Sequence, residues 1–196
     1  NSRSFVTNIE RQWFRFGEDF QMWIPRNNKY LEGKTTVDLN SQNPLHNVRP
    51  DHLVSGIFVD KVPLDKTRYF FYMEESKDDK FKYYIISVID VDVDSGQVEL
   101  VRKLWIERSS MHLVRQQYFD GSELVSDVRY SQLIEVGKAL INSKIEIERK
   151  RENYTIYFEL TKKGIKVNQP IKDRSFRVPR PPGAIVQILE EDETID

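Results

Sequence analysis

The sequence predicts a mainly β protein whose strands form one strongly curved antiparallel sheet. Aromatic and β-branched residues alternate with polar residues from position 5 onward, and turn formers interrupt this alternation at short intervals. Tight turns join antiparallel neighbours, which indicates a meander of roughly nine or ten strands. Several strands, such as 69–73 and 83–89, are apolar on both faces. Because a single-layer sheet in water keeps one face polar, a sheet that encloses its own interior explains this pattern best.

The composition indicates one folded domain with a well-solvated surface. The 196 residues include 30 basic and 31 acidic side chains, 39% hydrophobic residues and no cysteine. Such a balance of charge gives no reason to expect nucleic acid as a partner, and the lack of cysteine excludes disulfides and thiolate metal sites. No run of about 18 apolar residues predicts a membrane-spanning helix. We expect a single domain over residues 1–190 and an acidic tail over 191–196.

The N-terminal part is expected to begin with a hairpin. Its strands should cover 5–16 and 19–24, with Phe20 and Met22 on one face of the second strand. A proline ends this second strand because it cannot donate to the ladder of hydrogen bonds. Within the polar segment that follows, the alternation indicates one short strand at 34–39.

The segment VRPDHLVSGIF (48–58) contains the best helix signal of the chain. Pro50 occupies an expected first helical position, and Leu53, Val54 and Ile57 form an apolar stripe. A helix this short is stable only when its apolar stripe packs on another part of the protein.

The rest of the chain alternates between expected strands and polar turns, and the basic residues 149–151 lie at an expected hairpin tip. The strands are expected at 68–75, 80–93, 97–107, 111–119, 123–133, 144–152 and 154–167.

No motif in the chain predicts catalysis or metal binding. Asp90, Asp92 and Asp94 have the spacing of the first carboxylates of a calcium loop, but position 12 of that loop would be Val101 and the flanks are strands. We interpret them as the solvated face of one strand. The three histidines lack metal-site spacing, no serine lies in a G-x-S-x-G motif, and the eight glycines are dispersed. We therefore expect no enzyme activity, no cofactor and no metal.

Two stretches carry a resemblance to a known family. Residues 100–131 (LVRKLWIERSSMHLVRQQYFDGSELVSDVRYS) resemble a hairpin of the LolA/LolB-like lipoprotein-sorting family, in which a strand ends in a Trp-Ile pair, here Trp105 and Ile106. Residues 165–186 (IKVNQPIKDRSFRVPRPPGAIV) are similar to the end of that family's domain. The likeness covers about residues 67–188. It implies an open, strongly curved antiparallel half-barrel, with one or two short helices as a lid or plug over an apolar cavity for acyl chains.

The resemblance implies a non-enzymatic protein of the bacterial cell envelope that holds lipid or lipoprotein acyl chains in an apolar concavity and serves outer-membrane lipoprotein sorting. We expect it in the periplasm or at the outer membrane after removal of a signal sequence, with peripheral membrane contact and envelope protein partners. Any single apolar strand residue is more often part of an ordinary core than of a binding cavity, so the prediction concerns the following residues as a group. The expected cavity residues are Phe20, Met22, Phe71, Met73, Ile86, Val88, Leu104, Ile156 and Phe158, and the expected lid residues are Leu53, Val54 and Ile57.

Two alternatives belong to other functional classes. A structural or sensory envelope module would bind a protein partner with the same fold, through an exposed apolar patch on the convex face or an unpaired edge strand. A hydrolase with an unrecognised site would need a cleft with clustered ionisable groups of perturbed pKa. Both predict features of the surface that differ from an open apolar concavity.

Overall fold

The computed structural model describes residues 12–16, 19–34, 48, 50–59, 61–62, 65, 67–165 and 179–189 of the chain. The described residues divide into two compact units. One unit contains 56–165, and the other contains the described residues up to 55 together with 179–189. The expectation of a single domain over 1–190 stays a prediction. The expected acidic tail lies outside the described residues.

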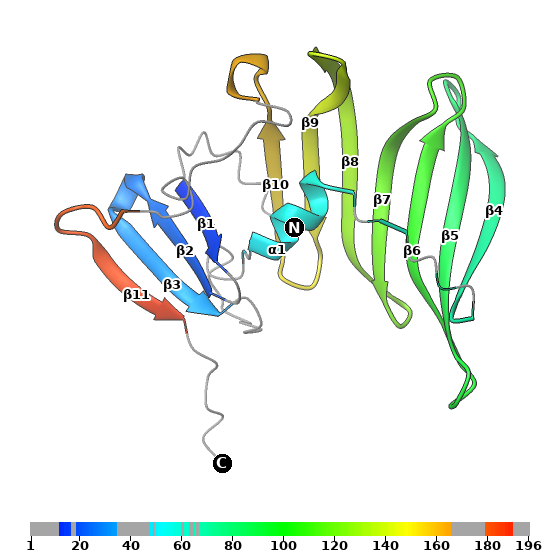
Figure 1. Cartoon of the computed structure of the whole chain (residues 1–196), viewed down its shortest axis with the longest axis horizontal. Coiled ribbons are helices and arrows are strands. Elements are labelled where there is room, and N and C mark those ends of the chain that lie inside the picture. The colour runs from blue at the N-terminus through cyan, green and yellow to red at the C-terminus, as the bar shows by residue number, and fades with distance from the viewer. Residues whose placement is uncertain are drawn as a thin grey trace. The chain divides into compact units, whose positions relative to one another are not determined.

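The larger unit is an open antiparallel sheet of seven strands in the order β10-β9-β8-β7-β6-β5-β4 (Figure 1). Each strand pairs with the next along the chain, so the predicted meander is confirmed here. In the part of the chain that the structure describes, the end strands β4 and β10 have one neighbour each. This open, mainly β architecture confirms the predicted fold class. The strands are β4 Tyr69–Lys77, β5 Lys82–Asp92, β6 Gln97–Glu107, β7 His112–Asp120, β8 Glu123–Val136, β9 Ala139–Arg149 and β10 Tyr154–Glu159.

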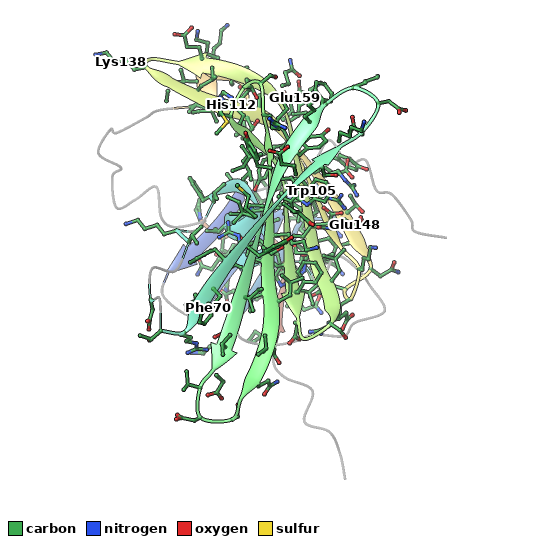
Figure 2. The ribbon with its side chains drawn as sticks, turned by 90° about the vertical axis from the view of Figure 1, so that its right-hand side faces the viewer. Phe70, Trp105, His112, Lys138, Glu148 and Glu159 are labelled. Atoms are coloured by element: carbon green, nitrogen blue, oxygen red, sulfur yellow. The ribbon has the colours of Figure 1, made fainter. Side chains whose placement is uncertain are left out.

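Register shifts interrupt three consecutive strand pairs of this sheet. They lie between Val88 and Ile89 in the β5–β6 pair, at Trp105/Ile106 in β6–β7, and at Tyr118/Phe119 in β7–β8. A bulge adds one residue to one strand, bends that strand and increases the local twist. The irregularities therefore account for the strong twist of this sheet (Figure 2).

The turn between β5 and β6 explains the three aspartates. The carboxylate of Asp92 accepts hydrogen bonds from the backbone N–H of Asp94 and from the Ser95 hydroxyl, at 3.0 and 2.7 Å. The backbone N–H of Gly96, whose φ of 72° favours glycine, donates to the Asp92 carbonyl oxygen. Asp94 thus lies in the turn beyond the end of β5, and the expectation that it shares a strand face with the other two aspartates is wrong.

The β8–β9 hairpin is longer than the sequence indicated. Strand pairing continues to Val136 and Ala139, and Lys138 lies at the tip (Figure 2). The expected strand limits at 133 and 144 were wrong, because the alternation of apolar residues continues through Ile134 and Val136 and resumes at Ala139 and Ile141 beyond the turn at Gly137. The next strand, β10, ends at Glu159 rather than 167, and Lys162–Gly164 form a 3-10 turn.

The smaller unit contains a sheet of four strands in the order β1-β2-β3-β11. The first hairpin is confirmed, with Phe16 opposite Asp19. A strand is present at 29–34, and of the strand expected at 34–39 the residues 35–39 lie outside the described residues. The expectation of one continuous antiparallel meander is wrong, because β11 pairs parallel with β3 in this separate sheet. The strands are β1 Gln12–Phe16, β2 Asp19–Ile24, β3 Lys29–Lys34 and β11 Ile185–Leu189.

Asn28 connects the start of β3 to the start of β11. Its carbonyl oxygen accepts a hydrogen bond from the backbone N–H of Ile185 at 2.9 Å, and its side-chain oxygen accepts one from the Trp23 indole at 3.1 Å. The residue has a left-handed φ of 48°, which asparagine tolerates better than most residues. This local geometry positions the C-terminal strand beside β3.

The helix α1 spans Pro50–Ile57, with Pro50 as its first residue, and confirms the predicted helix. Its last two residues belong to the larger unit. At this point Gly56 packs so closely on β9 that a Cβ atom would lie 2.2 Å from Cδ1 of Ile147.

Candidate functional site

One face of the seven-stranded sheet is mainly apolar and includes seven of the nine predicted cavity residues. Directly opposed residues of paired strands project from the same face, so the register defines its members. Phe71 lies opposite Val88, and Ile86 lies opposite both Met73 and Leu104. We call this surface the α1 face, because Gly56 of α1 packs on it. Its members include Phe71, Met73, Ile86, Val88, Arg102, Leu104, Gln116, Tyr118, Val128, Tyr130, Ile145, Ile147, Ile156 and Phe158.

The α1 face is closed in its middle and open at β4. Val88, Leu104 and Ile147 are buried, whereas Phe71 and Met73 expose 45% and 60% of their surface. The exposed pair lies across the register from the buried Val88 and the half-buried Ile86. An apolar surface therefore continues without interruption from the protein interior to the solvent at the β4 edge.

A chain of polar side chains crosses the middle of the same face. The guanidinium of Arg102 donates to the side-chain oxygen of Gln116 at 2.6 Å and lies 5.0 Å from the ring centre of Tyr118. The Gln116 amide donates in turn to the hydroxyl of Tyr130. Arg102, Gln116 and Tyr130 are all buried, and this row of hydrogen-bonded side chains lies between the apolar β4–β6 region and the place where Gly56 packs on Ile147. Sequence reasoning missed it, although Arg102 precedes Leu104 by two residues and shares its strand phase.

The opposite face of the sheet carries ion pairs and is exposed to solvent. Asp127 is only 2% exposed and accepts hydrogen bonds from Arg115 at 2.5 and 2.7 Å and from Arg129 at 2.9 Å. The bond to Asp127 raises the pKa of Arg115. Arg115 also lies 5.2 Å from the ring centre of Trp105, which Figure 2 shows on the same side as Glu148. The contrast with the α1 face gives this sheet one polar and one apolar side over most of its width.

Two predicted cavity residues lie elsewhere. Phe20 and Met22 belong to β2, in the four-stranded sheet, where Met22 is buried opposite Leu31. The side chain of Phe20 lies outside the described residues. The sequence cannot reveal this division, because alternation determines the phase within a strand and says nothing about which sheet the strand joins.

The three predicted lid residues differ in exposure. Leu53 is buried, Ile57 is half-buried and Val54 is exposed. The C-terminal end of α1 is connected to the sheet through Tyr130, whose hydroxyl donates to the carbonyl oxygen of Gly56. A role of this helix as a lid stays a prediction.

Several further ionisable groups with shifted pKa values lie at or next to turns. A hydrogen bond from the Tyr83 hydroxyl lowers the pKa of Asp78, and the hydroxyl of Ser109 does the same for Glu107. Burial, followed by the bond to Asp78, raises the pKa of Tyr83 to about 12. Each of these groups is explained by turn structure.

Within the described residues, no group of three or more histidine, aspartate or glutamate side chains could hold a metal ion. A search of the same residues finds no helix that is long and apolar enough to cross a membrane.

Neither protein-family models nor curated proteins match the chain. Solved structures that are similar to it include the following three. A DUF1329 family protein from Desulfovibrio piger is 14% identical, with a TM-score of 0.49 over 81% of this chain and 62% of that protein. A LolA superfamily protein from Nitrosomonas europaea is 13% identical, with a TM-score of 0.39 over 84% of this chain and 68% of that one. An outer-membrane lipoprotein-sorting protein domain from Vibrio parahaemolyticus is 11% identical, with a TM-score of 0.43 over 83% and 65%.

The family that the sequence resembles thus has members among the similar solved structures. The chain spans less than two thirds of the length of the Desulfovibrio protein. Because all three TM-scores are below 0.5, these likenesses carry no argument about the ligand or activity of this chain.

Proposed function

We propose that this protein is a non-enzymatic acyl-chain-binding protein of the bacterial cell envelope. Its binding surface is the α1 face between β4 and β6. The observation that carries the proposal is the continuity of exposed Phe71 and Met73 with buried Val88 and Leu104 on that face. Solvent-exposed apolar surface of this kind, on a sheet whose other face carries ion pairs over β7, β8 and β9, is typical of a binding surface.

Burial of the ligand supplies the affinity in this proposal. Each methylene group that leaves water contributes about 0.8 kcal/mol, so an acyl chain needs no charged partner to bind. The close packing of Gly56 on Ile147 occupies the region over β8 and β9. The ligand therefore lies at the β4 side of the face, where Phe71 and Met73 are open to solvent, and meets the buried apolar residues of β5 and β6 there.

The sequence resemblance to lipoprotein-sorting proteins indicates the biological setting of this binding. The ligand would be a lipid or the acyl chains of a lipoprotein, and the place of action the periplasm or the inner surface of the outer membrane. Sorting of outer-membrane lipoproteins is the process that fits this ligand and this location.

Native mass spectrometry with palmitate as the probe tests the proposal. We expect near one palmitate per chain. Phe71→Asp should weaken binding about tenfold or more, because it places a charge in an apolar surface and removes a side chain whose burial contributes about 1.5–3 kcal/mol. Phe70→Asp is the matched control, because Phe70 is the adjacent residue of β4, is similarly exposed and projects from the other face. A chain that ignores palmitate, or equal losses in both variants, would contradict acyl binding on the α1 face.

A protein-binding module of structural or sensory type is the second candidate. The observation that favours it is the edge strand β4, which exposes Phe70 and Tyr72 on one face as well as Phe71 and Met73 on the other. A lipid-free chain that also ignores palmitate would favour this second function.

A further inference from the structure

The edge strand β4 is unusually apolar on both of its faces. Phe70 and Tyr72 expose 53% and 59% of their surface on the ion-pair side, in addition to Phe71 and Met73 on the α1 face. Edge strands of soluble proteins are normally protected from pairing by lysine, proline, bulges or inward charges. The first five residues of β4 contain none of these, and its register with β5 is continuous.

The outer edge of β4 offers the backbone groups of Phe71 and Met73, whereas the N–H of Tyr69 already donates to the carbonyl oxygen of Asp65 at 2.8 Å. The N–H of Val91 donates to the carbonyl oxygen of Arg68 at 2.8 Å, which makes these opposed residues a hydrogen-bonded pair. Such pairs alternate along an antiparallel ladder, so the backbone groups of Phe70 and Tyr72 point toward β5. Those of Phe71 and Met73 point away from the sheet. Among the described strands, none pairs with this side.

We propose that a second copy of this chain pairs antiparallel with β4, about a two-fold axis at Phe71. In this register Phe71 faces its own counterpart, Tyr69 faces Met73, and Phe70 faces Tyr72. Every apolar side chain of the strand is then opposite another, and aromatic pairs of this kind stabilise antiparallel sheets. A self-complementary contact of this kind closes as a symmetric dimer.

Charge complementarity determines the register. With the axis at Phe71, Arg68 of each copy lies opposite Glu74 of the other. Arg68 already binds Asp90 at 2.7 Å but keeps 58% of its side chain exposed, and Glu74 is exposed as well. Moving the axis to Met73 would place Glu75 opposite Phe71 and remove both charge pairs.

The pairing joins the α1 faces of the two copies into one surface. The two-fold axis is perpendicular to the sheet, so each face of one copy continues into the same face of the other. The dimer does not depend on acyl binding, and its test uses the state of association rather than a lipid.

Sedimentation equilibrium over a range of protein concentrations provides the first test, with circular dichroism as the check of folding. The native chain should dimerise. Phe70→Lys combined with Tyr72→Lys places like charges opposite each other and should weaken the dimer at least tenfold. Phe70→Lys combined with Tyr72→Glu makes the same positions complementary and should restore dimerisation. A native chain that stays monomeric, or a dimer that tolerates the two lysines, overturns the proposal.

Cross-linking tests the register without charged substitutions. The chain has no cysteine, so Phe71→Cys introduces its sole thiol. The two copies of this thiol face each other across a pair with Cα atoms about 5.5 Å apart, within the range of a disulfide. Oxidation should therefore yield a covalent dimer. Glu75→Cys is the control, because eight residues separate its two copies along the strand, about 26 Å. Failure of Phe71→Cys to cross-link, or equal cross-linking by both variants, overturns the register.

Discussion

The hydroxyl of Tyr130 donates a hydrogen bond to the carbonyl oxygen of Gly56 at 2.7 Å and so connects the end of α1 to strand β8. The same hydroxyl accepts a hydrogen bond from the side-chain amide of Gln116. Both bonds are buried, where a hydrogen bond has no competition from water. Tyr130 therefore connects the helix to the polar chain that crosses the α1 face.

Tyr130→Phe should destabilise the protein by about 1–2 kcal/mol, because it removes a buried hydroxyl that both donates and accepts. Urea unfolding followed by circular dichroism measures the change. Tyr157→Phe is the matched control, since the Tyr157 side chain is exposed on β10. Removal of its hydroxyl should lower the free energy of unfolding by less than about 0.5 kcal/mol. Equal midpoints for the two variants would contradict a structural role for the Tyr130 hydroxyl.

Gly56→Ala should destabilise the protein even though alanine favours helices. The added Cβ would lie 2.2 Å from Cδ1 and 2.8 Å from Cγ1 of Ile147, which is fully buried. Overpacking of a core site costs about 1–3 kcal/mol.

Ile147→Val removes the nearer of these two atoms, so the penalty for Gly56→Ala should be smaller in that background. A double-mutant cycle in urea measures this coupling. Additive effects would show that the helix end moves away from β9 instead of pressing on Ile147.

Asp127→Asn should lower the free energy of unfolding by about 1.5–3 kcal/mol, because it removes a buried charge that accepts hydrogen bonds from Arg115 and Arg129. Glu146→Gln provides the comparison, since its carboxylate binds only the half-exposed Arg129 among the described residues and should contribute at most about 1 kcal/mol. Thermal unfolding at low and high salt distinguishes the two sites. If high salt removed the whole effect of Asp127→Asn, the ion pair would be a surface interaction.

The stability of the protein should fall at acid pH through its turn carboxylates. Hydrogen bonds from the Ser95 hydroxyl and from the backbone lower the pKa of Asp92, and the bonds from Arg68 lower that of Asp90. A group with a lowered pKa in the folded state contributes stability above its unfolded pKa, near 4, and loses it as the pH falls through the folded pKa. The melting temperature should therefore decrease below about pH 4.

Melting curves from pH 7 to pH 2 test this dependence, and Asp92→Asn should make it less steep. Asp94→Asn removes one charge from the same turn and controls for the change in net charge. An unchanged acid slope in Asp92→Asn would mean that its turn does not contribute to acid unfolding.

Strand phase was predictable from sequence. Phe71, Val88 and Leu104 were assigned to one face from alternation within separate strands, and the register places them side by side. The strand at 97–107 has the bounds that the sequence predicted, because a polar turn stands at each end. A short hairpin turn fixes the register of two neighbouring strands, so the strand phase of one determines which residues of the next lie on the same face.

Contacts between distant segments were not predictable. The pairing of β11 with β3 joins residues more than 150 positions apart, and nothing in either strand specifies the other. The polar chain from Arg102 to Tyr130 and the binding of Asp127 by two arginines likewise depend on the register across several strands.

The sequence by itself determined the mainly β class, the helix at Pro50, most hairpins and the shared strand phase of the apolar residues, because each depends on neighbours a few positions away. Only the tertiary structure decided that the strands divide into two sheets, that Gly56 packs on Ile147, and that β4 is an apolar edge among the described strands. These features arise from the packing of segments far apart in the chain, where a difference of one residue in register exchanges the two faces of a strand.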